Sequence, residues 1–99
     1  MNYSFHPSAQ FELSGSIDYY EDCQSGLGEA FAIEIFSAIQ RIIEFPKAWP
    51  KFSKNTRRCL VKRFPYGVIY QQLDTEILII SVMPLSRKPG YWKERVRSS

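Results

Sequence analysis

Residues 57–83, RRCLVKRFPYGVIYQQLDTEILIISVM, decide the fold of this chain. Three segments of this stretch are rich in β-branched and aromatic residues, as strands are. They are residues 57–64, 66–73 and 76–83. Turns are expected between them, at Pro65 and at Asp74 and Thr75. Because connections this short join antiparallel neighbours, the stretch predicts a three-stranded meander.

Two helices are predicted upstream of the meander. Pro7 stands where proline is tolerated best, at a first helical position, and an apolar stripe then runs to about Cys23. The stripe consists of Ala9, Leu13, Ile17 and Tyr20. The glycines of QSGLG, residues 24–28, end this helix and reverse the chain. A second helix should therefore lie antiparallel to the first, until Pro46 stops it.

The second helix is predicted to have a broad apolar face. Its main stripe consists of Leu27, Phe31, Ile35, Ile39 and Ile42. Three further residues, Ile33, Phe36 and Ile43, widen this stripe. A helix that is apolar over so much of its surface has to bury two sides. We expect one side to pack on a sheet and the other on the first helix or on a bound partner.

The remaining segments complete an α+β order. NYSFH, residues 2–6, predicts a short first strand, and residues 45–55 predict an irregular connector. The order β-α-α-β-β-β predicts a helical hairpin packed on one face of a small antiparallel sheet, with the first strand at an edge. The other face would be free for function. We expect one domain over residues 1–99, with the tail, residues 84–99, docked in part and its last residues disordered.

Length and composition limit the kind of site. A chain of 99 residues with 44% apolar residues is typical of one ordered globular module. Its longest apolar run, Ile77 to Ile80, is too short for a membrane span, so a cytoplasmic protein is expected. Cys23 and Cys59 are predicted to be free thiols, since neither belongs to a CxxC motif. His6 lacks partners for a catalytic or metal site, so we expect a helix-entry or surface role, and no metal or cofactor.

The two halves of the chain carry opposite charge. Residues 1–50 contain two cations and seven carboxylates, a net charge of −5. Residues 51–99 contain eleven cations and three carboxylates, a net charge of +8, which gives +3 for the whole chain. A segregated basic half is typical of a protein that binds a polyanion or an acidic partner. Basic strand and tail surfaces that are simply solvated remain the alternative.

Many of these cations lie on the first strand of the meander. Alternation places Arg57 and Arg63 on one face of the strand, and Arg58 and Lys62 on the other. Apolar residues also lie on both faces, so the sequence leaves open which pair of cations meets solvent.

The tail, RKPGYWKERVR at residues 87–97, interleaves cations with Tyr91 and Trp92. This pattern suits a phosphate backbone with stacked bases, and it equally suits a tail that Trp92 anchors on the sheet. RNA cleavage would need a base, an acid and fixed cations. The candidates for these groups are Arg87, Tyr91 and either Lys62 or Arg63.

Five segments occur in this order along the chain: YSFHPSAQFELSGSIDYYE, GLGEAFAIEI, FPKAWP, RRCLVKRFPYGVIYQ and SRKPGYW. Through these segments, over about residues 2–95, the chain resembles the RelE/ParE superfamily, the toxins of type II toxin-antitoxin (plasmid-stabilisation) modules. This resemblance implies the fold predicted above and a cognate antitoxin as partner. A dimer or a toxin-antitoxin heterotetramer is compatible with it, and no membrane is expected to be involved.

The resemblance implies one of two activities. RelE-type relatives cleave messenger RNA on the ribosome, using strand cations, an arginine after the last strand and a tail tyrosine. Tyr91 matches the tyrosine and Arg87 lies near the arginine. Gly67 stands at the position of a strand arginine of these relatives, and Leu60 at the position of a strand lysine. Leu85 is the direct match for the arginine after the last strand. ParE-type relatives lack this set and trap DNA gyrase on cleaved DNA.

The leading hypothesis is therefore a non-enzymatic, ParE-like toxin that inhibits DNA gyrase. The alternative is a metal-independent endoribonuclease acting on ribosome-bound messenger RNA through Arg87, Tyr91 and Lys62. A third hypothesis is an inactive or antitoxin-like binding module. The antitoxin's acidic C-terminal segment is expected in a groove lined by apolar hairpin residues and by Arg57, Arg63 and Arg87. Target or antitoxin binding is predicted for Arg57, Arg58, Lys62, Arg63, Arg87, Tyr91 and Trp92.

Overall fold

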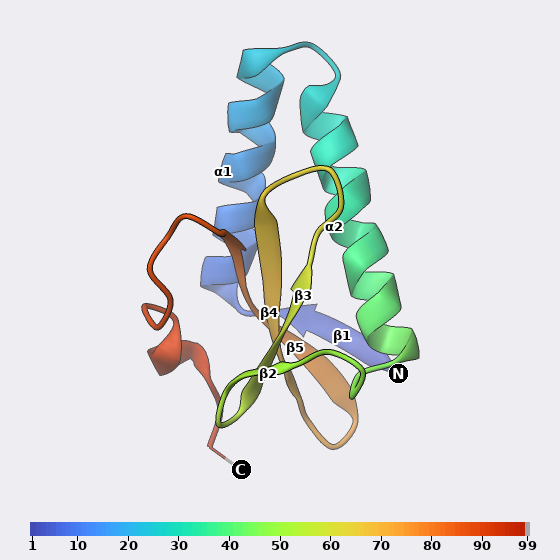
Figure 1. Cartoon of the computed structure of the whole chain (residues 1–99), viewed down its shortest axis with the longest axis vertical. Helices are drawn as coiled ribbons and strands as arrows, with labels where there is room; N and C mark the ends of the chain where they lie inside the picture. The colour runs from blue at the N-terminus through green and yellow to red at the C-terminus, as the bar shows by residue number, and fades with distance from the viewer. Residues whose placement is uncertain (99) are drawn as a thin grey trace.

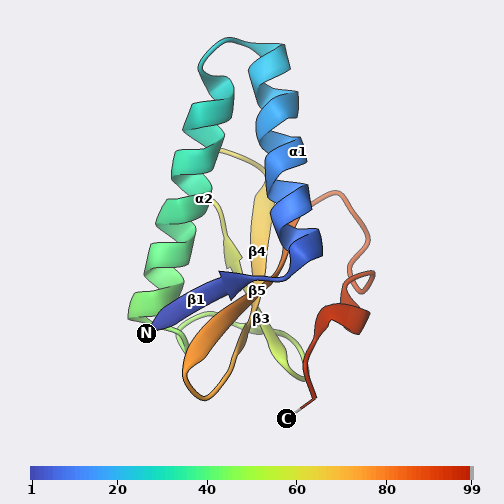
Figure 2. The same ribbon diagram turned by 180° about the vertical axis from the view of Figure 1, so that it is seen from behind.

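A computed structural model describes residues 1–98, and over these residues two helices pack on one five-stranded sheet (Figure 1). The elements in chain order are β1 (Asn2–Phe5), α1 (Pro7–Cys23), α2 (Leu27–Glu44), β2 (Lys51–Ser53), β3 (Thr56–Leu60), β4 (Tyr66–Gln72), β5 (Glu76–Pro84) and the 3-10 helix η1 (Lys93–Arg95). The strands lie in the order β1-β5-β4-β3-β2. Both helices lie on the same side of the sheet (Figure 2), which confirms the predicted α+β fold with its helical hairpin.

The sheet is mixed rather than antiparallel. β3, β4 and β5 form the predicted antiparallel meander, with Arg58 opposite Ile69 between β3 and β4. β1 joins the edge, as predicted, but it runs parallel to β5, with Asn2 opposite Glu76. The expectation of a wholly antiparallel sheet is therefore wrong. Only strands joined by a tight turn have to be antiparallel, and both helices and three strands separate β1 from β5 along the chain.

Two strand boundaries also differ from the prediction. The connector predicted to be irregular contains β2, Lys51–Ser53, which pairs with β3 at the sheet edge. A strand of three residues next to prolines is too short to show an alternating pattern. β3 ends at Leu60 instead of residue 64, because the chain already turns at residues 61–65, where Arg63 has a left-handed φ of 69°.

Local interactions close the helical hairpin. His6 caps α1, since its Nδ1 accepts a hydrogen bond from the backbone N–H two residues later at 3.1 Å, which confirms its helix-entry role. Gly26 starts α2 with a left-handed φ of 86°. The carboxylate of Glu21 accepts hydrogen bonds from the N–H groups of Gly26 and Gly28. Gly28 also lets the helices approach, because a Cβ there would lie 2.7 Å from the Ile17 carbonyl oxygen.

The main core lies between the hairpin and the sheet. Phe31 and Ile35 of α2 and Val68 of β4 are among its fully buried side chains. The outer residues of α2 differ, since Ile33 and Phe36 are 56% and 44% exposed. One side of the broad apolar face is therefore buried as predicted, and the other remains largely open. No helix within residues 1–98 is both long and apolar enough to cross a membrane.

The tail packs on the opposite face of the sheet. Trp92 is 1% exposed and lies in a second apolar cluster with Ile69, Ile80 and Met83. The face that was expected to be free is therefore partly covered, with the Trp92 ring as the anchor. Figure 1 shows this segment running down beside the sheet. Ser99, one of the tail residues expected to be disordered, lies outside the described residues.

Candidate functional site

One corner of the tail-side face combines cations with exposed apolar side chains. Gly67 of β4 lies opposite Leu60 of β3, and both Leu60 and Leu85 are exposed. A Cβ at Gly67 would lie 3.0 Å from Cδ of Arg58 and 3.6 Å from Cδ2 of Leu85. The missing side chain thus lets Arg58 lie across β4. We call Arg58, Leu60 and Leu85 around the buried Gly67, together with Arg87 of the following tail segment, the basic corner.

Tyr91 supports Arg87 but directs its hydroxyl group inward. The guanidinium carbon of Arg87 lies 3.5 Å from the centre of the Tyr91 ring, a cation-π contact. The Tyr91 hydroxyl lies 2.8 Å from Oγ of Ser81 on β5. Since Ser81 donates its own proton to the carboxylate of Glu12, the Tyr91 hydroxyl is the donor to Ser81. Burial also raises the pKa of Tyr91, so the phenol stays protonated near neutral pH.

Glu12 of α1 joins the tail to the sheet. Its Oε1 accepts hydrogen bonds from the Ser81 hydroxyl at 2.9 Å and from the Val82 N–H at 3.1 Å. Its Oε2 lies 3.0 Å from Nη1 of Arg95, which also donates to the Ile80 carbonyl. We call Glu12, Ser81, Tyr91 and Arg95 the tail clamp.

The tail clamp was not foreseen from the sequence. Glu12 occurs among the polar residues of a predicted helix, and Ser81 lies inside an apolar strand. The opposite charges of the two chain halves were the only signal that the acidic half would pair with the basic half. They did not indicate which residues meet.

Trp92 lies under the basic corner and contacts it through Phe52. Its ring lies 5.9 Å from that of Phe52, centre to centre. The guanidinium carbon of Arg58 lies 4.3 Å from the centre of the Phe52 ring. Since Trp92 is almost fully buried, it holds the tail in place in this conformation rather than presenting itself to a partner.

The remaining predicted cations lie elsewhere. Arg57 donates to the Trp49 carbonyl at 2.6 Å on the helix side of the sheet, where the neighbouring Cys59 is also buried. Arg63 lies 3.8 Å from the carboxylate of Glu34 on α2. The structure therefore does not bring Arg57, Arg63 and Arg87 together in one groove. The open question of strand faces is decided for Arg57 and Arg58, which lie on the helix side and the tail side respectively.

Lys62 and Arg63 fall in the turn after β3, where strand alternation no longer applies. Lys62 is exposed there. Within residues 1–98, no three side chains of the metal-binding types come together to hold an ion.

The basic corner offers the guanidinium charge and N–H donors of its arginines, and the apolar contact of its leucines, to a partner.

Comparison with known proteins identifies similar chains. A family model described as "ParE toxin of type II toxin-antitoxin system, parDE" matches residues 3–89. No curated protein matches the sequence. Among solved structures, the chain is similar to one described as "Chromosomal ParDE TA system from P. aeruginosa", with a TM-score of 0.64 and 14% identity. That alignment covers 85% of this chain and 95% of the other, and at this identity it supports the fold.

Proposed function

The chain belongs to the ParE toxin family of type II toxin-antitoxin systems, and we propose that it inhibits DNA gyrase as a non-enzymatic toxin. In this proposal the basic corner contacts gyrase and holds the enzyme in its cleaved-DNA state. A cognate antitoxin neutralises the toxin by covering part of its surface.

The orientation of Tyr91 is the observation that favours gyrase over RNA as the target. A tyrosine that donates or accepts the proton in RNA cleavage has to place its hydroxyl beside the reacting phosphate. The Tyr91 hydroxyl instead points to Ser81, and its ring lies against Arg87. Gly67 stands where the ribosome-dependent relatives have a strand arginine, and Arg58 fills the space above it. These contacts favour a surface that binds a protein over one that cleaves RNA.

We place the antitoxin on the outer face of α2. Ile33 and Phe36 are exposed there, and the Phe36 ring lies 6.3 Å from that of Phe5 on the edge strand β1. Large apolar side chains beside an unpaired strand edge are typical of a surface that a partner covers. Phe36→Glu should abolish co-purification with an acidic-tailed protein encoded beside this chain, whereas Gln24→Glu, at an exposed position in the turn between the helices, should not.

The gyrase proposal is tested by a plasmid supercoiling and cleavage assay with purified gyrase, ATP and the full chain. We expect broken plasmid DNA to accumulate. Arg87→Ala should reduce this effect by about tenfold, equivalent to about 1.4 kcal/mol of binding free energy. Lys47→Ala, at an exposed position outside the basic corner, should leave the effect unchanged.

A folded chain that leaves gyrase untouched would contradict the proposal. Cleavage of ribosome-bound messenger RNA by the same chain, abolished in Tyr91→Phe, would then support the endoribonuclease. Circular dichroism of each variant shows whether a loss of effect follows from unfolding.

A further inference from the structure

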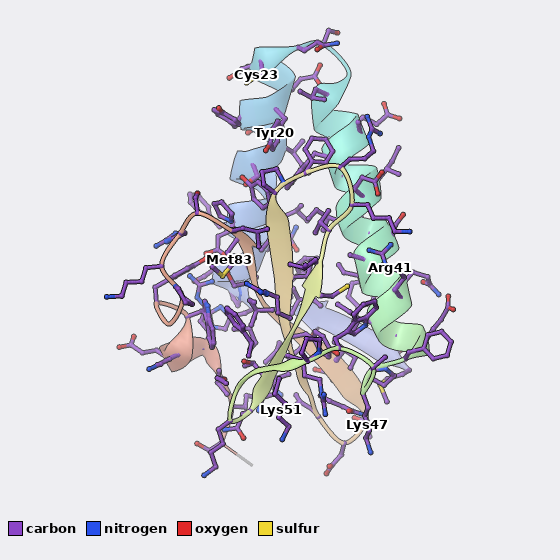
Figure 3. The ribbon with its side chains drawn as sticks, in the orientation of Figure 1. Tyr20, Cys23, Arg41, Lys47, Lys51 and Met83 are labelled. Carbon is purple, nitrogen blue, oxygen red and sulfur yellow. The ribbon has the colours of Figure 1, made fainter. Side chains whose placement is uncertain are left out.

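A cleft of about 810 Å³ lies at the other end of β4 from the basic corner. The basic corner includes Gly67, near the start of β4. The cleft is lined by residues 70–76, at the far end of β4 and in the turn that follows it. The β2–β3 hairpin and Arg97 of the tail form its other walls. Figure 3 shows Lys51, one of the lining residues, at the end of the molecule opposite Cys23 at the hairpin tip.

The floor of this cleft is fixed by buried polar contacts. Thr56, Tyr70 and Gln71 line it and are buried. The side-chain amide of Gln71 donates to the Arg97 carbonyl at 2.8 Å and accepts from the Arg97 N–H at 2.9 Å. The Tyr70 hydroxyl donates to the Pro46 carbonyl at 2.6 Å. The paired hydrogen bonds at Gln71 hold the backbone of Arg97 at the rim, so the tail wall is part of the folded structure.

Unpaired cations line two walls of the cleft. Lys51, Lys54 and Arg57 come from the β2–β3 hairpin, and Arg97 comes from the tail. None of these four cations makes an ion pair within residues 1–98. The third wall is acidic and contains Asp74 and Glu76, of which Glu76 accepts a hydrogen bond from the Ser4 hydroxyl. Arg57 donates one N–H to the Trp49 carbonyl, and the remaining N–H groups of these four cations are available to an anionic ligand on the hairpin and tail side.

We propose that this cleft binds the phosphodiester backbone of nucleic acid. Long cationic side chains on separate segments can each reach a different phosphate along a strand. Among residues 1–98, the lining includes no glycine-rich turn whose N–H groups would converge on a single small phosphate. Leu73 is the only aliphatic side chain among these described lining residues, so an acidic peptide would lack the apolar anchors that such a partner needs.

The test measures the binding of the full chain to a fluorescently labelled 20-base-pair DNA by anisotropy, over a series of salt concentrations. Single-stranded DNA and RNA of the same sequence are compared with it. Each phosphate contact contributes about eightfold in affinity at roughly 0.1 M salt, from a slope of about −0.9 in log K against log salt concentration. Lys54→Gln and Arg97→Gln should each weaken binding by about this factor and flatten the slope by about 1.

Two matched variants make the test specific. Asp74→Asn removes a carboxylate from the acidic wall and should tighten binding severalfold. Lys88→Gln removes an exposed tail cation outside the cleft and should change the affinity less than twofold.

Equal losses in Lys88→Gln and Lys54→Gln would overturn the proposal, because the chain would then bind DNA through its overall charge. Displacement of the DNA by inorganic phosphate or by polyglutamate at matched charge concentration would also overturn it. The inference does not depend on the gyrase target, since a chain that traps gyrase but binds no free nucleic acid refutes this inference alone.

Discussion

Replacing Glu12 by alanine is expected to detach the tail from the sheet. The carboxylate accepts hydrogen bonds from Ser81 and Val82 and pairs with Arg95 at 3.0 Å. The side chains of Glu12 and Arg95 are only 15% and 16% exposed. Removing one partner of a largely buried ion pair costs about 3 to 5 kcal/mol, and some exposure places this pair at the lower end, at about 3 kcal/mol. For a domain of this size, such a loss lowers the Tm by about 12 to 24 °C.

The free energy of unfolding is measured by urea denaturation, with Trp fluorescence as the probe. Release of the tail should expose Trp92, which is 1% exposed in the folded chain, so its emission should also shift to the red before global unfolding. Glu44→Ala is the control, since Glu44 is exposed and makes no ion pair within residues 1–98. It should change stability by less than about 0.5 kcal/mol.

A double-mutant cycle isolates the ion pair itself. Glu12→Gln keeps an acceptor for Ser81 but removes the charge, and Arg95→Met keeps most of the side-chain volume. We expect a coupling free energy of at least about 1 kcal/mol between these two substitutions. A coupling below about 0.5 kcal/mol, or a Glu12→Ala variant as stable as Glu44→Ala, would refute the tail clamp.

Three further substitutions test other parts of the fold. Trp92→Ala should lower the free energy of unfolding by about 3 to 5 kcal/mol, because it empties the centre of the tail-side cluster; a loss below 1 kcal/mol by urea denaturation would contradict this. Gly28→Ala should cost about 1 to 3 kcal/mol, since its Cβ would lie 2.7 Å from the Ile17 carbonyl oxygen; Gly15→Ala, with open space around its Cβ, is the control in the same assay. Burial raises the pKa of Tyr70 to about 12, so its contribution to stability is complete below pH 10 and falls by up to roughly 2 to 3 kcal/mol as the pH rises through 12. Urea titrations between pH 9 and 11.5 should therefore show a flatter pH dependence for Tyr70→Phe than for the parent chain, and equal slopes would count against the assignment.

Patterns within short stretches of sequence predicted most of the fold. The apolar stripe ending near Cys23 and the glycines after it located α1 and the hairpin turn, because helix periodicity and left-handed turns are local properties. β2 and the early end of β3 were missed. A three-residue edge strand is held by its pairing with a neighbour, and the left-handed Arg63 carries no glycine or asparagine signature.

The candidate site was only partly predictable. Arg87 and Tyr91 were identified as neighbours in the tail, and the structure stacks one on the other. The direction of the Tyr91 hydroxyl depends on Ser81, which depends in turn on Glu12, 69 positions away from Ser81 along the chain. No local pattern contains that information, because it arises only when α1, β5 and the tail pack together.

The sequence by itself determined the helices, the meander and the separation of acidic and basic halves, since periodicity, turn residues and charge are properties of neighbouring residues. The tertiary structure decided which faces those charges occupy. Packing against α2 turned Cys59, and with it Arg57, toward the helices and left Arg58 on the tail side. It also decided that β1 lies parallel to β5, that Trp92 covers the second face, and that four separate cations meet beside one cleft. These outcomes follow from burying apolar surface on both faces of one sheet, a condition that no single segment can satisfy alone.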